Sequence, residues 1–319
     1  KEKAAQGVEV YFMYDDFGCI AMLPWHYHKL LSGEGIHCEI AGKFSPVLSH
    51  IHNNRDHRKI TVIDGRVGFT GGINLADEYI NAVVKFGHWK DTAVKIEGGA
   101  VRNLMALFLM NWNTQSKKNP IDYTKYMSLP AWQTEGRGIV IPFGSGPGPI
   151  YTDTIGKNVY LNMINAAKDY LYLTTPYLIC DREILSALRM AAKKGVDVRI
   201  ITPHIPDKPT VFFMTRSNYK ALLDDGVKIY EYTPGFIHAK NYVCDDKFAV
   251  CGTINMDYRS LVHHFECGAW MYGADCIEEM KADFLSTAAQ SGMVDKNKAV
   301  MRSWQRMIAE IMKVFSPLF

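Results

Sequence analysis

The feature that most constrains this chain is a short pattern of His, Lys and Asp that occurs twice, at residues 57–64 and 238–245. Each copy reads H-x-K-x4-D, and the repeated side chains are His57, Lys59, Asp64, His238, Lys240 and Asp245. A single copy would be a weak signal, because chance supplies such triples. The surroundings repeat as well, since Asn74 and Asn255 each follow their His by 17 residues. The chain is therefore predicted to contain two similar halves.

Each pattern lies in a run of apolar residues typical of a buried strand. Residues at i and i+2 of a strand point to the same face, so the His and Lys of each copy are expected to enter one common site. The Asp of each motif stands five residues after the Lys and leaves that face. We therefore interpret Asp64 and Asp245 as motif residues that support the strand, through an ion pair, rather than contacting a substrate.

The composition is that of a folded protein long enough for two domains. The 319 residues are 48% hydrophobic and 22% charged, which is ordinary for globular chains. The net charge of +3 suits a surface that tolerates anionic headgroups, but it is too small for a dedicated nucleic-acid binder. The seven cysteines contain no C-x-x-C pair. We interpret them as reduced core thiols in a cytosol-facing protein, rather than as disulfides or a metal site.

These motifs resemble the signature of the phospholipase D superfamily, and within it the bacterial cardiolipin synthases. The segments that carry the closer match are 57–59, 69–79, 89–92, 175–177 and 255–260. The resemblance covers nearly the whole chain. The sequence departs from the family pattern at His264, where the family usually has Asn. The role that this Asn has in the family is therefore open here. His264 is interpreted as a substrate contact that replaces the Asn, or as a structural histidine.

The alternation of strand and helix patterns predicts an α/β fold with parallel strands covered on both faces. The resemblance implies two similar phospholipase D-like halves, each a mostly parallel sheet flanked by helices, with the active site at their interface. Gly and Pro at residues 144–149 are expected to preclude regular structure. The boundary is placed near residue 140, giving domains 1–140 and 141–319. Comparison of the halves indicates that the first lacks its opening strand and helix, about 40 residues.

The chemistry that the resemblance implies is phosphodiester exchange by two histidines. One imidazole attacks phosphorus, and the other protonates the leaving alcohol and then deprotonates the incoming one. By family analogy His57 is the nucleophile and His238 the general acid and base; the reverse assignment stays open. Lys59 and Lys240 would supply positive charge to the phosphoryl oxygens, so neither a metal nor another cofactor is expected.

Further residues are expected to orient these groups or bind the substrate. Asn74 and Asn255 would donate hydrogen bonds to the phosphoryl oxygens, with Gly72 and Thr253 beside them in the second part of the signature. Each His also needs a partner that fixes its tautomer. We assign Glu266 to His238 and Asp91 to His57, each within its own half. Arg55 and Arg259 flank the motifs and are interpreted either as a second phosphate site or as ordinary ion pairs.

The resemblance implies a phosphatidyltransferase that forms cardiolipin and glycerol from two phosphatidylglycerol molecules through a phosphatidyl-histidine. A hydrolase that releases phosphatidic acid would use the same residues, and a nuclease or a non-catalytic membrane-binding fragment are further alternatives. The expected partners are phosphatidylglycerol, other anionic phospholipids and the membrane surface, without nucleic acid. The expected location is the bacterial cell membrane, reached through segments that this otherwise soluble chain lacks.

The end of the chain has an amphipathic pattern over residues 301–315. Its apolar stripe comprises Trp304, Met307, Ile308, Ile311, Met312 and Phe315. The preferred interpretation is that the stripe packs on its own domain, and the alternative is a helix that lies in a membrane interface. No apolar run in the sequence reaches the roughly 18 residues of a membrane-spanning helix.

Overall fold

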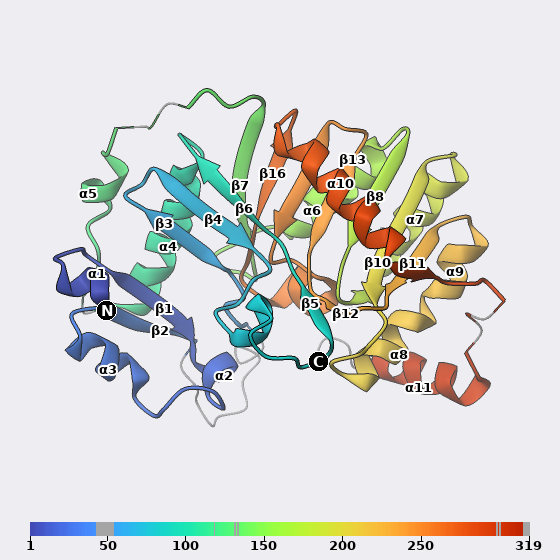
Figure 1. The fold of residues 1–319 in the computed structure, drawn as a ribbon, viewed down its shortest axis with the longest axis horizontal. Coiled ribbons are helices and arrows are strands. Elements are labelled where there is room, and N and C mark those ends of the chain that lie inside the picture. Colours follow the sequence, from blue (N-terminus) through green and yellow to red (C-terminus); the bar gives the residue numbers. More distant parts are fainter. Residues whose placement is uncertain are drawn as a thin grey trace.

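The computed structural model describes residues 1–42, 54–117, 119–130, 132, 134–297, 299 and 301–314. Two regions of helix and sheet lie next to each other (Figure 1). The part before residue 139, blue to teal in Figure 1, forms one region, and the part from residue 139, green to red, forms the other.

The first region contains two small sheets with helices beside them. Its elements are α1 (Glu2–Ala5), β1 (Tyr11–Asp15), α2 (Asp16–Cys19), α3 (Tyr27–Gly33), β2 (His37–Ala41), β3 (Ile60–Ile63), β4 (Val67–Gly71), η2 (Asp77–Ile80), β5 (His88–Lys90), β6 (Ala93–Glu97), α4 (Val101–Gln115) and α5 (Tyr123–Met127). Strand β1 pairs with β2 in parallel, and β4 pairs with both β3 and β6 in antiparallel fashion.

The second region is built on one eight-stranded sheet. Its elements are β7 (Ile139–Ser145), α6 (Ile155–Ala166), β8 (Tyr170–Thr174), β9 (Leu178–Ile179), α7 (Arg182–Lys193), β10 (Asp197–Pro203), α8 (Pro209–Ser217), α9 (Tyr219–Asp224), β11 (Lys228–Tyr232), β12 (Gly235–Ile237), β13 (Asn241–Cys244), β14 (Phe248–Gly252), β15 (Met256–Asp257), η3 (Arg259–His263), β16 (Glu266–Tyr272), α10 (Cys276–Ala289), β17 (Ser291–Met293) and α11 (Ser303–Val314).

The α/β class is confirmed, but the sheets are less parallel than expected. The large sheet has the order β17-β11-β10-β8-β13-β14-β16-β7. Only β8, β10 and β11 are parallel neighbours, and the other neighbouring pairs in this sheet are antiparallel. The reason is the length of the connections. Only residues 245–247 join β13 to β14, which suffices for a hairpin but not for a parallel crossover.

Helices cover the large sheet on both faces, which explains why its central strand β8 is buried throughout. All five residues of β8 are buried. Leu171 and Leu173 pack in the cluster that includes helices α6 and α7, whereas Tyr170 and Tyr172 pack in the cluster on the α10 side. This alternation is the two-residue period of a strand. Figure 1 accordingly shows α10 in front of the sheet and α6 behind it.

Strand β7 runs through Gly144 and Ser145, although Gly and Pro were expected to preclude a strand there. Gly144 lies in close packing, because a Cβ on it would force the side-chain ends of Tyr151 and Leu107 to move. Strand β7 pairs with β16 along its whole length. The second sheet therefore begins at Ile139, next to the boundary proposed near residue 140.

The two regions differ in one strand position. In the second region β8 lies between β10 and β13 and joins them into one sheet. The corresponding strands of the first region, β1 and β3, belong to separate sheets, and the described residues contain no strand between them. The missing strand and helix of the first half, which we expected from comparing the two halves of the sequence, stay a prediction.

The amphipathic tail forms helix α11 and packs against α8, but not through the expected face. Ala309 is fully buried, whereas Trp304, Met307, Ile308 and Ile311 are 41–59% exposed. The expectation that the apolar stripe packs on its own domain is therefore wrong for these residues; Phe315 lies outside the described residues. No helix in the described part of the chain has the length and apolar character needed to cross a bilayer.

Candidate active site

The two motif histidines lie where the regions meet, each just before a strand, β3 or β13. The backbone N–H of His57 donates to the carbonyl of Phe265 at 2.9 Å, and the backbone N–H of His238 donates to the carbonyl of Lys90 at 2.7 Å. Strand β5 also pairs with β12 across the junction. Each histidine is thus attached to the opposite region.

Each motif histidine contacts a carboxylate that belongs to the other region. Glu266 directly follows Phe265, and its Oε2 lies 2.9 Å from Nδ1 of His57. Asp91 directly follows Lys90, and its Oδ2 lies 2.7 Å from Nδ1 of His238. The expected assignment within each half is therefore wrong, because the residue before each carboxylate accepts a hydrogen bond from the backbone of the histidine of the other region. A carboxylate at Nδ1 fixes the ring and leaves Nε2 for chemistry.

Gly72 and Thr253 help to position these carboxylates in two different ways, one by leaving space and the other by a hydrogen bond. A Cβ at Gly72 would collide with the Asp91 carboxylate, so glycine is required for Asp91 to reach His238. Thr253 instead donates its hydroxyl to Glu266. The backbone N–H groups of both residues donate to the carbonyl of the residue that follows the carboxylate, Thr92 or Cys267. The signature residues therefore position the carboxylates.

The motif lysines hold equivalent positions. Lys59 Nζ donates to the carbonyl of His57 at 2.7 Å, and Lys240 Nζ donates to the carbonyl of His238 at 2.5 Å. Lys240 is fully buried, and its Nζ also lies 2.9 Å from Nε2 of His238. The Lys240 amino group thus lies next to the ring of His238, whereas Lys59 is held at the backbone of His57.

Burial sets the protonation of these groups. Burial lowers the pKa of His57 to about 4, although Glu266 raises it in part. Burial and the Lys240 charge lower the pKa of His238 to about 3. Burial likewise lowers the pKa of Lys240 to about 7. Both imidazoles are therefore neutral at neutral pH, as a nucleophile requires, and the negative charge of a bound phosphodiester would raise all three pKa values.

The expected amide donors reach the same cavity. Asn74 and Asn255 both line it. Asn74 Nδ2 donates to the hydroxyl of Tyr79 at 2.6 Å, and the Tyr79 ring lies edge-on to His238 with 5.4 Å between ring centroids. Tyr79 is a site residue that the motif pattern missed, although it belongs to the segment 69–79 that carried the resemblance.

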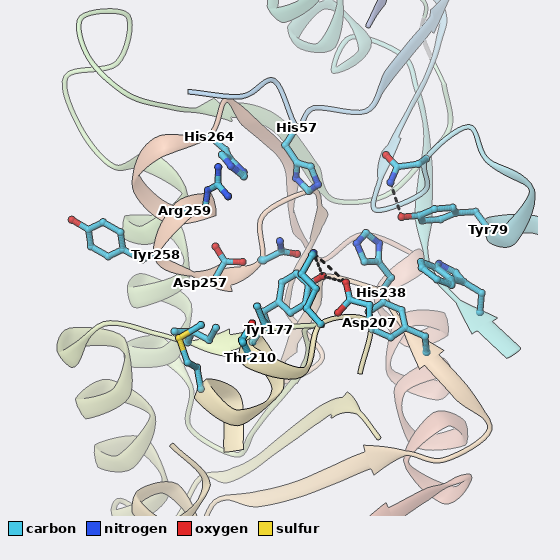
Figure 2. A pocket seen from close by; sticks show the side chains of 18 residues that line it. His57, Tyr79, Tyr177, Asp207, Thr210, His238, Asp257, Tyr258, Arg259 and His264 are labelled. Atoms are coloured by element: carbon cyan, nitrogen blue, oxygen red, sulfur yellow. Dashed lines mark hydrogen bonds and ion pairs between the residues drawn. The ribbon is translucent and has the colours of Figure 1, made fainter. Parts of the chain in front are cut away.

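A cavity of about 510 Å³ brings these residues together. Figure 2 shows His57 and His238 pointing into it from different elements. Helix α8 and the residues before it form another wall, with Asp207, Lys208, Thr210, Val211 and Met214. Tyr177 donates to Asp207 at 2.6 Å. This wall has no motif in the sequence, and only the fold places it at the site.

The motif aspartates do not line the cavity. The Asp245 carboxylate accepts hydrogen bonds from the backbone N–H groups of Lys168, Asp169 and Tyr170 at 2.8–3.0 Å, so it fixes the start of β8. The bonds are to backbone amides, whereas an ion pair was expected. Asp64 is exposed and shares the left-handed φ of 53° with Asp245. Both residues therefore hold turns between motif strands.

Comparisons with known proteins agree with this geometry. Residues 160–287 match a family model described as cardiolipin synthase, phospholipase D-like domain. A cardiolipin synthase of Geobacillus kaustophilus is 39% identical over 318 residues, which cover 99% of this chain and 63% of that protein. An uncharacterized protein of Streptococcus mutans is 45% identical over 319 residues, which cover 100% of this chain and 68% of that protein. The chain belongs to the phospholipase D superfamily.

A solved structure supports the superfamily fold. A phosphatidylserine synthase of Haemophilus influenzae superposes with a TM-score of 0.62 at 13% identity, covering 85% of this chain and 70% of that one. The chain spans less than two thirds of the length of cardiolipin synthases such as the one from Geobacillus kaustophilus. The likeness to the solved structure concerns the fold alone.

His264 lines the cavity of this phospholipase D superfamily member. Its Nδ1 lies 3.4 Å from Oε1 of Glu266, and its ring centroid lies 5.7 Å from that of His57. Among the described residues, His57, His264 and Glu266 form the one group with metal-ligand spacing, their ligand atoms lying within 4.8 Å of one another. The mechanism without a metal, which we expected from Lys59 and Lys240, stays a prediction.

Proposed function

We propose that this chain is a phosphatidyltransferase that forms cardiolipin and glycerol from two molecules of phosphatidylglycerol. The observation that carries the proposal is the pair of histidines at one cavity, each with a carboxylate on Nδ1, together with two lysines. This arrangement suits two successive displacements at one phosphorus atom, since it offers one nucleophile, one proton carrier and charge for the phosphoryl oxygens.

In the first displacement, Nε2 of His57 attacks the phosphorus of phosphatidylglycerol. A bond forms between nitrogen and phosphorus, and the bond from phosphorus to the headgroup oxygen breaks. His238 in its protonated form gives its proton to that oxygen, and glycerol leaves. The Glu266 carboxylate stabilises the positive charge that develops on His57.

In the second displacement, the terminal hydroxyl of another phosphatidylglycerol attacks the phosphatidyl-histidine. The neutral His238 takes the proton of this hydroxyl, the new oxygen–phosphorus bond forms, and the nitrogen–phosphorus bond to His57 breaks. Cardiolipin leaves, and His238 is protonated again for the next cycle. The two steps consume two lipids and release one glycerol, without any net change in protons.

Hydrolysis is the second candidate function, because water that enters the same cavity would yield phosphatidic acid with the same residues. A nuclease and a non-catalytic membrane-binding fragment are less favoured than hydrolysis. The net charge of +3 is small for nucleic-acid binding, and a binding module has no need for two histidines with matched carboxylates.

Exposed apolar side chains next to the cavity support a membrane surface as the partner. Leu75 and Ile80 are 92% and 73% exposed and directly follow Asn74 and Tyr79, which line the cavity. Helix α11 exposes its apolar stripe beside α8, whose residues form another cavity wall. The teal segment after β4, α8 and α11 all lie along the lower edge of the molecule in Figure 1. We propose that this apolar edge rests in the bilayer interface.

Replacing Leu75 and Ile80 with Ser should lower binding to phosphatidylglycerol vesicles by about tenfold or more, because two exposed apolar side chains no longer enter the interface. The measurement is cosedimentation with vesicles. The matched double variant Met190→Ser with Leu285→Ser removes two exposed apolar residues from α7 and α10. Equal loss of binding in both variants would contradict the proposed edge.

A product assay tests the transfer itself. Phosphatidylglycerol in mixed micelles is incubated with the chain, and the lipids are separated by mass. We expect cardiolipin and glycerol. Phosphatidic acid without cardiolipin would replace the proposal with the hydrolase. A folded protein that forms neither product would contradict both catalytic functions.

A further inference from the structure

Arg259 is a cation in the wall of the cavity, and no carboxylate among the described residues forms an ion pair with it. It begins η3, a single turn of π-helix, a conformation that is frequent at functional sites. The two arginines near the first motif differ from it. Arg55 is bound to Asp15 at 2.5 Å, and Arg58 is bound to Asp56 at 2.9 Å. Of the two residues interpreted above as a phosphate site or an ion pair, Arg55 therefore forms the ion pair and Arg259 does not.

The surroundings of Arg259 hold further polar atoms that lack partners. The Nε of Arg259, the hydroxyl of Ser260 and the Nε2 of His264 are buried without a hydrogen-bond partner in the described part of the chain. The nearby Asp257 carboxylate accepts the backbone N–H of Ser260 at 2.8 Å. Burial lowers the pKa of Arg259, Asp257 offsets part of this effect, and Arg55 adds to it. Arg259 is partly buried, and a buried guanidinium nitrogen without a partner is costly, so this wall is suited to receive an anion.

The position of Arg259 relative to the histidines indicates which anion binds to it. Figure 2 shows Arg259 and His264 on one side of His57, and Tyr79 and His238 on the other. All of them line the same cavity. A phosphate at the histidines would lie close to Lys240, whose Nζ is 2.9 Å from Nε2 of His238, whereas a group beside Arg259 would lie further along the cavity. One cavity thus offers two separate cationic positions.

We infer that Arg259, assisted by His264, binds the phosphate of the acceptor lipid while the phosphatidyl group of the donor is attached to His57. This inference rests on the proposed function. In transfer, the attacking hydroxyl carries its own phosphodiester three carbons away, so a second anion must enter the cavity. A guanidinium suits it, because its planar fork binds two phosphate oxygens at once. Water or glycerol as acceptor brings no such anion. Arg259 therefore selects the anionic acceptor.

The test measures acceptor choice within one reaction. The donor is a phosphatidyl ester of p-nitrophenol, and two soluble acceptors compete: glycerol, which is neutral, and glycerophosphoglycerol, which carries a phosphodiester. The products are separated by mass, and their ratio is compared between variants. Because the ratio is internal to each reaction, a smaller folded fraction does not change it. We expect Arg259→Gln to lower the ratio of anionic to neutral transfer product by about 10- to 100-fold.

Two further variants sharpen the test. Arg259→Lys keeps the charge without the fork and should give an intermediate ratio. Lys281→Gln removes a cation of α10 that lies outside the cavity and is bound to Asp246 at 2.8 Å, and it should leave the ratio as in the wild type. An unchanged ratio in Arg259→Gln, or an equal loss in Lys281→Gln, would overturn the assignment of Arg259. Absence of transfer to either acceptor in the wild type would overturn the proposed function instead.

Discussion

Replacing His57 or His238 with Ala is expected to lower cardiolipin formation by about 10⁴-fold or more, because each change removes a group that bonds to the substrate or moves its proton. The two variants differ when the donor is the phosphatidyl ester of p-nitrophenol, whose leaving group needs no acid. His238→Ala should then release one equivalent of p-nitrophenol in a burst and retain the phosphatidyl group on His57. His57→Ala should give no burst.

The measurement combines stopped-flow absorbance with the intact mass of the protein. Both variants are compared with the wild type by circular dichroism, so that loss of fold is recognised. A burst in His57→Ala, together with none in His238→Ala, would reverse the assignment of nucleophile and proton carrier. Turnover near the wild-type rate in either variant would contradict the two-histidine mechanism.

Glu266→Gln and Asp91→Asn should each lower turnover by about 10²- to 10⁴-fold, but at different steps. An amide in place of the orienting carboxylate favours the wrong tautomer and removes the charge that stabilises an imidazolium. Because Glu266 contacts His57, Glu266→Gln should slow the p-nitrophenol burst. Because Asp91 contacts His238, Asp91→Asn should keep the burst and slow the turnover that follows.

Comparing the bursts of Glu266→Gln and Asp91→Asn tests directly whether each carboxylate contacts the histidine of the other region. The opposite result, a slow burst in Asp91→Asn and a normal burst in Glu266→Gln, would mean that each carboxylate serves the histidine of its own half, or that the histidine roles are reversed. The burst experiment on the histidine variants separates those two explanations. Asp64→Asn is the matched control, since it makes the same chemical change at an exposed motif residue outside the cavity.

Local patterns were sufficient for much of the fold. The period of two in β8 and the side chain of Asp181, which accepts from the backbone N–H of Ile184 at the start of α7, are decided within a few residues. Sequence reasoning was weaker where a connection decides direction, as in the antiparallel hairpin of β13 and β14.

The sequence by itself determined that two copies of His and Lys belong to one chemistry, because the repeated spacing is an internal property of the chain. Only the tertiary structure decided which carboxylate serves which histidine. Glu266 is separated from His57 by 209 positions in the sequence, and Asp91 from His238 by 147 positions. The tertiary structure also decided that Arg55 is neutralised by Asp15 while Arg259 faces the cavity. Hydrogen bonds and ion pairs depend on distance in space, and spacing along the chain does not encode that distance once two regions pack together.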